Sequence, residues 1–469
     1  MKYHYHTVII GGGSAGISAA RTFADFGIKV LIIEKAKMGG DCLNSGCIPS
    51  KSFIKIAKDL KNKTVDDKFN LAIQTVKEKI AIIENHDSIS TLNKYKIDVI
   101  IGNPKIVNKN TIIVNNKEIF TKYIIIATGS SPMIPKIKGL DKIDYLTNNN
   151  FFEYHKKFES IAIIGAGTIG LELSFALNNL GINVELFDTS NQILEKEDQE
   201  IQTALLNQLK QEKIEINLNV NINEFMKNNS KTEIRFVKNG IQSQKTFDKI
   251  LIATGRVSNY KDLWDSNQLD IKISDHKKIM VNKKNQTSYK NIYAVGDVAN
   301  NYLSTNAAGK QATYAAIRIL LKVSKKIDDN MLARVFFFNP MISSIGFNEK
   351  TLITKKKPYL VFNGNFMEND RAICESNTQM SFKILTDLKY QILGVILIGN
   401  DLDNLINFWT LAINKKIKLY NLIFTDFAYP TYGEAFRDLI RDLYFKINFK
   451  PKIKKIINSF SFPLKQKIV

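Results

Sequence analysis

The chain has only three cysteines in 469 residues, too few for a scaffold held together by disulfides. It also lacks any apolar run close to the roughly 18 residues that a membrane-spanning helix needs. Its first apolar segment begins at Thr7, which leaves no room for the regions of a signal peptide. These absences predict a cytoplasmic protein. In that reducing compartment a cysteine pair more often serves catalysis or metal binding than structure.

The bulk composition is that of a globular protein, with 44% hydrophobic and 24% charged residues. The length predicts about three domains. The net charge of +21 would suit a nucleic-acid partner, but the basic residues are scattered, and Lys, Asn and Ile are abundant throughout the chain. A drift of the whole composition explains the charge, and we expect no nucleic-acid partner.

Two segments, 7–34 and 161–188, repeat one plan of strand, glycine-rich turn, helix and second strand. Each second strand ends in an acid, and Glu34 follows Gly11 by 23 positions, as Asp188 follows Gly165. Such turns let a pyrophosphate approach the backbone at the N-terminus of the helix. The matched copies predict two dinucleotide-binding units, the second inserted within the first. Their turn glycines are Gly11, Gly13, Gly16, Gly165, Gly167 and Gly170.

The acid at the end of each second strand carries information about the nucleotide. A carboxylate at this place accepts hydrogen bonds from ribose hydroxyls and repels a 2′-phosphate. Asp188 is followed by Thr189, Ser190 and Asn191, and no arginine stands there to receive such a phosphate. The second unit therefore predicts NADH rather than NADPH as its ligand.

Cys42 and Cys47 lie five positions apart at the expected start of a helix. That spacing puts them about one and a half turns apart, so only a distorted first turn would let them bridge. A disulfide closing so short a loop adds little stability, and a helix N-terminus lowers a thiol pKa, so the pair predicts redox chemistry. The alternative is half of a metal site, but the sequence has no second cluster of cysteines or histidines to complete four ligands.

The segment Gly39–Lys51 around these cysteines resembles the active-site signature of the class I pyridine nucleotide-disulfide oxidoreductases. That family includes dihydrolipoamide dehydrogenase, glutathione reductase and mercuric reductase. The resemblance runs from residue 5 to about 440. It includes Tyr123–Gly129, Ile250–Arg256, Thr287–Asp297, Pro340, Gly346 and Ala428–Arg437.

The resemblance implies an α/β fold with two Rossmann-like domains, one for FAD and one for NAD, and a C-terminal α+β dimerisation domain. Alternating apolar segments after residue 331, such as Arg334–Phe338 and Tyr390–Ile398, also predict an α+β domain on an antiparallel sheet. The expected boundaries are 1–150 and 276–330 for the FAD-binding domain, 151–275 for the NAD-binding domain, 331–442 for the dimerisation domain and 443–469 for a basic tail.

The resemblance also implies a role for each residue of the redox centre. Cys47 would be the thiolate nearer the flavin, Cys42 would exchange with substrate, and Lys51 would lie near the flavin N5 and pair with Glu172. A cation there would stabilise negative charge that develops on the reduced flavin. The implied activity is that of an NAD(H)-dependent flavoprotein disulfide oxidoreductase.

The two cofactors would be held by residues of both units. The first unit with Glu34 would bind the ADP half of FAD, Asp297 would bind its ribityl chain, and the second unit with Asp188 would bind NADH. Further cofactor contacts are expected at Gly40, Asp41, Lys51, Ala127, Thr128, Gly129, Gly255 and Gly296.

The C-terminal motif departs from the lipoamide and glutathione reductases, in which a histidine precedes Pro-Thr and acts as acid–base across the interface of a homodimer. Tyr429 stands in its place, although Glu434, the acid that would orient the histidine, is present. A tyrosine with an ordinary pKa near 10 is a poor proton shuttle at neutral pH. Tyrosine here resembles mercuric reductases, yet those enzymes end in a cysteine pair that this chain lacks. The third cysteine, Cys374, is expected to be a lone buried thiol.

Two functions therefore stay open on the sequence alone. One is a dihydrolipoamide dehydrogenase-like reductase of a disulfide substrate, and the other is a mercuric reductase-like flavoprotein whose small-molecule acceptor is a quinone or a metal ion. A protein that only binds nucleotides would need neither the cysteine pair nor Lys51 and Glu172.

The tail from Leu443 to Val469 has seven lysines and no acid. It predicts a helix from Pro451 that packs on its own domain or makes a weak contact with an anionic membrane surface.

Overall fold

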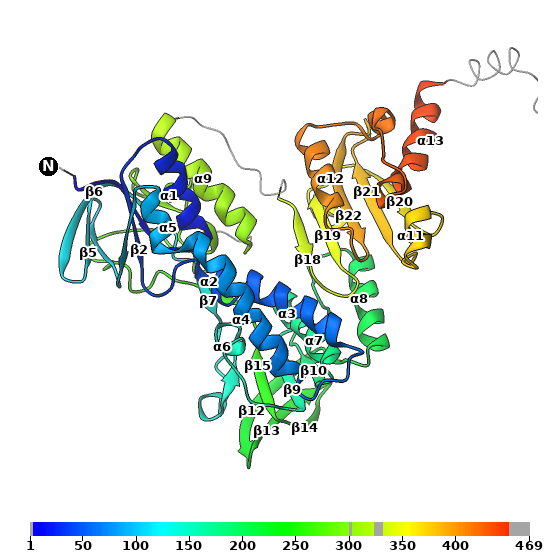
Figure 1. The fold of residues 1–469 in the computed structure, drawn as a ribbon, viewed down its shortest axis with the longest axis horizontal. Coiled ribbons are helices and arrows are strands. Elements are labelled where there is room, and N and C mark those ends of the chain that lie inside the picture. The colour runs from blue at the N-terminus through cyan, green and yellow to red at the C-terminus, as the bar shows by residue number, and fades with distance from the viewer. Residues whose placement is uncertain (1–2, 300–302, 323–331, 450–469) are drawn as a thin grey trace, which may run out of the picture. The chain divides into compact units, whose positions relative to one another are not determined.

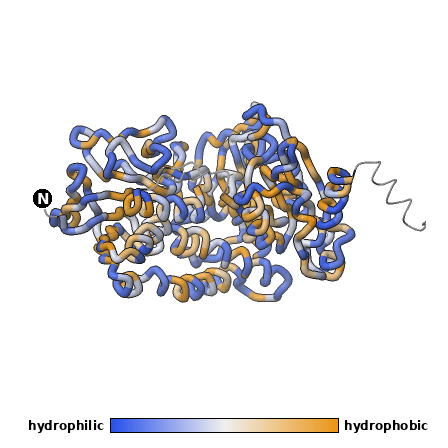
Figure 2. Tube along the Cα trace, turned by 90° about the horizontal axis from the view of Figure 1, so that it is seen from above, coloured by the Kyte–Doolittle hydropathy of each residue, from blue (hydrophilic) through white to orange (hydrophobic). Residues whose placement is uncertain are grey.

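The computed structural model describes residues 3–299, 303–322 and 332–449. The chain forms two compact units, the first of Met1–Glu195 and Leu206–Asp329 and the second of Lys196–Leu205 and Asn330–Val469 (Figure 1). Hydrophobic stretches along the chain are short and are interrupted by hydrophilic ones (Figure 2). Within the described ranges, no helix has both the length and the apolar character needed to cross a membrane.

A parallel sheet with the order β3-β2-β1-β6 forms the centre of the first unit, and β17 pairs with the far edge of β6. Strands β1 and β2 are buried along almost their whole length, as expected of parallel strands covered on both faces. Strand β17 lies beyond the second dinucleotide-binding segment in the sequence but pairs with β6 of this sheet. The second dinucleotide-binding segment is therefore inserted within the first. The strands are β1 (Tyr5–Ile10), β2 (Val30–Glu34), β3 (Ile97–Ile101), β6 (Lys117–Ile126) and β17 (Ile292–Ala294), with β4 (Lys105–Asn108) and β5 (Thr111–Val114) as an antiparallel extension.

A second parallel sheet, with the order β11-β10-β9-β15-β8, belongs to the inserted part. Its strands are β8 (Tyr145–Leu146), β9 (Ser160–Ile164), β10 (Asn183–Phe187), β11 (Glu215–Asn217) and β15 (Lys249–Ile252). An antiparallel sheet of β12 (Val220–Asn228), β13 (Lys231–Lys238) and β14 (Ile241–Phe247) accompanies it, and β7 (Ser130–Pro132) pairs with β16 (Arg256–Ser258).

Helices of the first unit start where the sequence predicts nucleotide-binding turns. Helix α1 (Ser14–Asp25) follows β1 and lies beside α9 (Thr305–Leu321), as Figure 1 shows. Helix α7 (Thr168–Asn179) follows β9 and packs against α3 (Cys47–Leu60), which also packs against α4 (Lys68–Asp87). The remaining helices are α2 (Gly40–Asn44), α5 (Ile89–Lys94), α6 (Asn148–Phe151) and α8 (Gln199–Gln211), the last divided between the two units.

The second unit is the expected α+β domain, with an antiparallel sheet of order β18-β19-β22-β21-β20. The antiparallel sheet expected from the apolar segments is present, and its central strand β22 is buried at every position. Successive side chains of a strand point to opposite faces, and Val395 and Ile396 are both buried, so both faces of this strand are covered. The elements are β18 (Arg334–Phe336), β19 (Ile342–Gly346), α10 (Glu349–Thr354), β20 (Leu360–Asn365), α11 (Asp370–Cys374), β21 (Ser381–Thr386), β22 (Ile392–Ile398), α12 (Leu405–Asn414) and α13 (Arg437–Asn448).

A buried ion cluster fixes the segment Lys196–Leu205 within the second unit. The ammonium of Lys383, whose side chain is 5% exposed, lies 2.6 Å from both Asp198 Oδ2 and Glu349 Oε2 and also pairs with Glu200. These three carboxylates are close enough together to suit a metal ion, but the lysine already supplies a cation among them. Loss of one partner from such a buried cluster leaves uncompensated charge, which typically costs about 3–5 kcal/mol.

The basic tail is described only in part. Residues 443–448 belong to α13, whereas the helix expected from Pro451 lies outside the described residues.

Candidate active site

In each glycine turn the first and third glycines lie against backbone atoms, and the middle glycine has open space where a pyrophosphate would lie. A Cβ at Gly11 would collide with the carbonyl of Ala127, and one at Gly16 would collide with the carbonyl of Gly11. Gly165 and Gly170 are confined in the same way. By contrast, among the described residues a Cβ at the middle glycine of the second turn, Gly167, would meet no atom within 4 Å, and one at Gly13 would meet only the Cα of Gly40, at 3.6 Å. Both turns therefore fit a dinucleotide at the start of a helix.

Each strand-end acid is fixed against its own glycine turn. Glu34 Oε2 accepts a hydrogen bond from the Gly12 N–H at 2.6 Å, and Asp188 Oδ2 accepts one from the Ala166 N–H at 2.6 Å. The second oxygen of Glu34 accepts from the Ala36 N–H, and that of Asp188 from the Ser190 N–H. A carboxylate oxygen has more than one lone pair, so both acids can also accept from ribose hydroxyls.

Other expected cofactor residues follow the carboxyl ends of strands. Ala127, Thr128 and Gly129 follow β6, and Gly296 and Asp297 follow β17 at the same edge of the first sheet as the turn after β1. Ligands of open α/β sheets bind outside this edge.

In the second sheet, Gly255 lies three positions beyond the end of β15 with a φ of +125°. Its backbone is in a conformation that residues with a side chain rarely adopt.

The cysteines occupy two helices rather than one distorted helical turn, which corrects the sequence prediction. Cys42 lies in α2, which ends at Asn44, and Cys47 is the first residue of α3. Gly46 stands between the helices, and a Cβ there would lie 2.7 Å from the Asp41 carbonyl. The break brings the two thiols together, unbridged and half-buried, and places Cys47 at a helix N-terminus.

The two thiols have opposite pKa shifts. The pKa of Cys47 is lowered to about 6, first by the hydrogen bond from Cys42 and further by the Thr305 hydroxyl and the charge of Lys51, against the effect of burial. The same hydrogen bond to Cys47 is the main reason why the pKa of Cys42 is raised. Near neutral pH the pair is therefore one thiolate, Cys47, and one thiol, Cys42, and the thiolate is the nucleophilic form.

The ion pair implied by the resemblance is present beside this thiolate. Lys51 lies one helical turn after Cys47 on α3, and its Nζ is 2.8 Å from Glu172 Oε2 on α7. Glu172 is 4% exposed, so the pair joins two packed helices and is not a solvated surface contact.

An arginine that the sequence analysis left without a role links two expected cofactor residues. Arg256 pairs with Asp41 and donates from Nε to Ser130 Oγ at 2.7 Å. The Ser130 hydroxyl in turn donates to Asp297 Oδ2 at 2.6 Å, and Arg256 Nε lies 3.9 Å from the same oxygen. The sequence signal was the arginine that closes the motif Ile250–Arg256.

The residues that depart from the resemblance lie in the second unit. The Tyr429 side chain is 72% exposed, and its pKa is raised, chiefly by a hydrogen bond to Asp370. Glu434 is buried and accepts a hydrogen bond from Arg437 at 2.9 Å. Cys374 is exposed, which contradicts the expected buried thiol, because the short helix α11 buries only Ala372.

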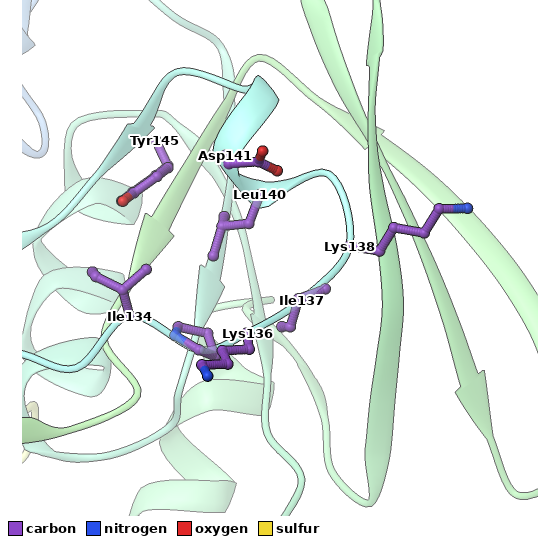
Figure 3. A pocket seen from close by; sticks show the side chains of 8 residues that line it. Ile134, Lys136, Ile137, Lys138, Leu140, Asp141 and Tyr145 are labelled. Atoms are coloured by element: carbon purple, nitrogen blue, oxygen red, sulfur yellow. The ribbon is translucent and has the colours of Figure 1, made fainter.

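A surface pocket of about 420 Å³ lies in the first unit, apart from these groups. Residues of the loop before Tyr145 line it, and none of them is an expected site residue (Figure 3). The pocket is lined by Ile134, Pro135, Lys136, Ile137, Lys138, Leu140, Asp141 and Tyr145.

The chain is similar to known redox enzymes over nearly its whole length. It is 30% identical to a dihydrolipoyl dehydrogenase of Buchnera aphidicola over 91% of this chain and 93% of the relative. It is 29% identical to a mercuric reductase of Lysinibacillus sphaericus, with coverage of 92% and 82%. Among solved structures, the Cu(II) complex of the HOCl-induced flavoprotein disulfide reductase RclA from Escherichia coli is 25% identical, with a TM-score of 0.84 over 94% of this chain and all of that one.

Family profiles give the same result. Residues 5–312 match the pyridine nucleotide-disulphide oxidoreductases, and residues 332–440 match the dimerisation domain of those enzymes. The dimerisation domain indicates that the protein forms a homodimer. The protein is a flavoprotein disulfide oxidoreductase with FAD and NAD(P)H as cofactors. The chain belongs to the pyridine nucleotide-disulphide oxidoreductase family.

Proposed function

We propose that the protein is an NADH-dependent disulfide reductase in which Cys47 is the resident thiolate and Cys42 exchanges with a disulfide substrate. The observation that carries this proposal is the position of Cys47 at the first residue of α3, 3.2 Å from the Thr305 hydroxyl, together with the opposite pKa shifts of the two neighbouring thiols. A structural or metal-binding pair would not need such a division. Bound FAD and NADH would supply the two electrons that reduce the Cys42–Cys47 disulfide.

The thiol pair can then pass these electrons on by two exchange steps. Cys42 attacks one sulfur of the substrate, whose S–S bond breaks, and the proton of Cys42 goes to the first leaving thiolate. The Cys47 thiolate next attacks the sulfur of Cys42 and releases the second substrate sulfur as a thiolate, which takes a proton from water. One disulfide is formed in the protein and one is reduced in the substrate.

We further propose that Tyr429 and Glu434 of the partner subunit face this pair in the homodimer. Support comes from the dimerisation domain and from the exposed position of Tyr429. The Tyr429 phenol, with its raised pKa, stays protonated near neutral pH and is a poor base for Cys42. A cytoplasmic location suits a thiol pair that works in its reduced form. The weak membrane contact of the tail stays a prediction.

Because Tyr429 is a poor base for Cys42, a second candidate function is favoured, in which the electron acceptor is not a disulfide. Reduction of a metal ion or a quinone does not need a protonated leaving thiolate. Relatives include mercuric reductases and a reductase solved as its Cu(II) complex. Turnover with NADH should be measured for lipoamide, glutathione disulfide, Hg(II), Cu(II) and quinones. Fastest turnover with a disulfide supports the first candidate, and fastest turnover with a metal ion or quinone supports the second.

NADH should be preferred over NADPH by at least about tenfold in kcat/KM, which corresponds to roughly 1.4 kcal/mol. The physical reason is repulsion between the Asp188 carboxylate, fixed against the second glycine turn, and a 2′-phosphate. Asp188→Ser should narrow the preference, whereas Asp144→Ser, which removes an exposed carboxylate of the same unit, should leave it unchanged. Equal kcat/KM values for the two nucleotides with the natural protein would contradict the assignment.

A further inference from the structure

We infer that the Thr305 hydroxyl stabilises the Cys47 thiolate and thereby makes the Cys42–Cys47 disulfide easier to reduce. The inference rests on the proposed function, because it concerns the same thiol pair. Nothing in the cysteine segment itself indicates this residue, which lies 258 positions away along the chain.

The position of Thr305 is set by the start of a long helix. It is the first residue of α9, and Ser304 before it caps the helix by accepting a hydrogen bond from the Ala307 N–H at 3.2 Å. The Thr305 side chain is therefore not needed as the cap, and its Oγ1 lies 3.2 Å from Cys47 Sγ. Packing of α9 along α1 holds this helix start in place, and the Ser14 hydroxyl reaches the Thr305 carbonyl at 3.5 Å.

The direction of the hydrogen bond follows from the charge state of the sulfur. A thiolate has no proton to give, so the hydroxyl must donate and the sulfur must accept. A disulfide sulfur carries no charge and is a weaker acceptor, so the bond favours the reduced pair over the oxidised pair. Thr305 is the first residue of α9, so the partial positive charge at the N-terminus of that helix also lies beside Cys47.

Thr305 acts among three other groups that face Cys47. The Cys42 thiol donates to the Cys47 sulfur, the Lys51 ammonium attracts the thiolate charge, and the negative charge of Glu172 disfavours the Cys47 thiolate. Lys51 and Glu172 are a bound ion pair, and their charges offset each other in part. Unlike Lys51 and Glu172, Thr305 is neutral, so its contribution does not depend on a second ionised group.

The test compares Thr305→Val, which keeps the shape but removes the donor, with Thr305→Ser, which keeps the donor. Thr313→Val removes a hydroxyl from the same helix and is the matched control. The holoenzyme is reduced with NADH without oxygen, and iodoacetamide alkylation of Cys47 is followed against pH by mass spectrometry. The midpoint should rise by about one pH unit in Thr305→Val and stay near about 6 in the other two variants and the natural protein.

A second measurement reads the redox equilibrium itself. Equilibration of the thiol pair with a glutathione redox buffer near pH 8 should show Thr305→Val about tenfold harder to reduce, or about 30 mV more negative. The Ser variant should match the natural protein. An unchanged midpoint and potential in a folded, flavin-loaded Val variant would overturn the inference. If instead the natural protein forms no disulfide or has no acidic thiol at Cys47, the proposed function fails.

Discussion

Replacing Cys47 with serine is expected to abolish the long-wavelength absorption band of the NADH-reduced enzyme and to lower kcat/KM for the electron acceptor by at least about 10³-fold. The band requires a thiolate beside the flavin, and Cys47 is the sulfur with the lowered pKa at the start of α3. A serine hydroxyl is neither ionised near neutral pH nor able to form the disulfide. Absorption spectra during anaerobic NADH titration, followed by steady-state kinetics, measure both effects.

Cys374→Ser is the matched control for this prediction. It removes the exposed cysteine of the second unit and leaves the pair intact, so band and turnover should both be unchanged. FAD content should be equal in both variants, because neither residue belongs to the glycine turns. A band that survives Cys47→Ser would show that Cys42 is the resident thiolate and would reverse the two assignments.

Restoring histidine at Tyr429 should raise kcat/KM for lipoamide by about 100-fold, the lower end of the usual range for well-placed acid–base catalysis. An imidazole titrates near neutral pH and can take the proton of Cys42, whereas the phenol, hydrogen-bonded to Asp370, has a raised pKa. Glu434, the acid that we expect to orient the imidazole, is present in this chain. Steady-state assays with NADH and lipoamide measure the gain.

Two comparisons make this second prediction specific. Tyr429→Phe removes the hydroxyl without supplying a base, so lipoamide turnover should not rise. Flavin reduction by NADH should be fast in every variant, because it does not involve this residue. Fast lipoamide turnover by the natural protein, or no gain in a dimeric Tyr429→His variant, would mean that the pocket serves another acceptor and would favour the metal or quinone alternative.

The sequence was sufficient to predict the strands, turns and helices of the two dinucleotide-binding segments, because local spacing determines their backbone. The spacing from the first turn glycine to the strand-end acid is the same in Gly11–Glu34 and in Gly165–Asp188. Both dinucleotide-binding segments need the same lengths of turn, helix and strand. The structure has the strands, turns and helices of both dinucleotide-binding segments where this spacing predicted them. The order of the motifs was enough to indicate the fold and the redox pair.

The predictions that failed concerned burial and a break between helices, which sequence periodicity does not reveal, and the residues that were missed come from distant segments. Cys374 is exposed because its helix has barely more than one turn and only one buried residue, which periodicity alone does not reveal. The break at Gly46 that brings Cys42 and Cys47 together depends on the close approach of the Asp41 carbonyl. Arg256 and Thr305 reach the site from other strands and helices, so no local pattern marked them.

Counting thiols before and after reduction tests the central claim most directly. The oxidised holoenzyme should receive one equivalent of NADH without oxygen, then be denatured and labelled with a thiol reagent. The chain has three cysteines, so we predict that only Cys374 is labelled before NADH and that Cys42 and Cys47 are labelled as well afterwards. The same labelling before and after NADH would contradict the account, because the electrons would then not reach the cysteine pair.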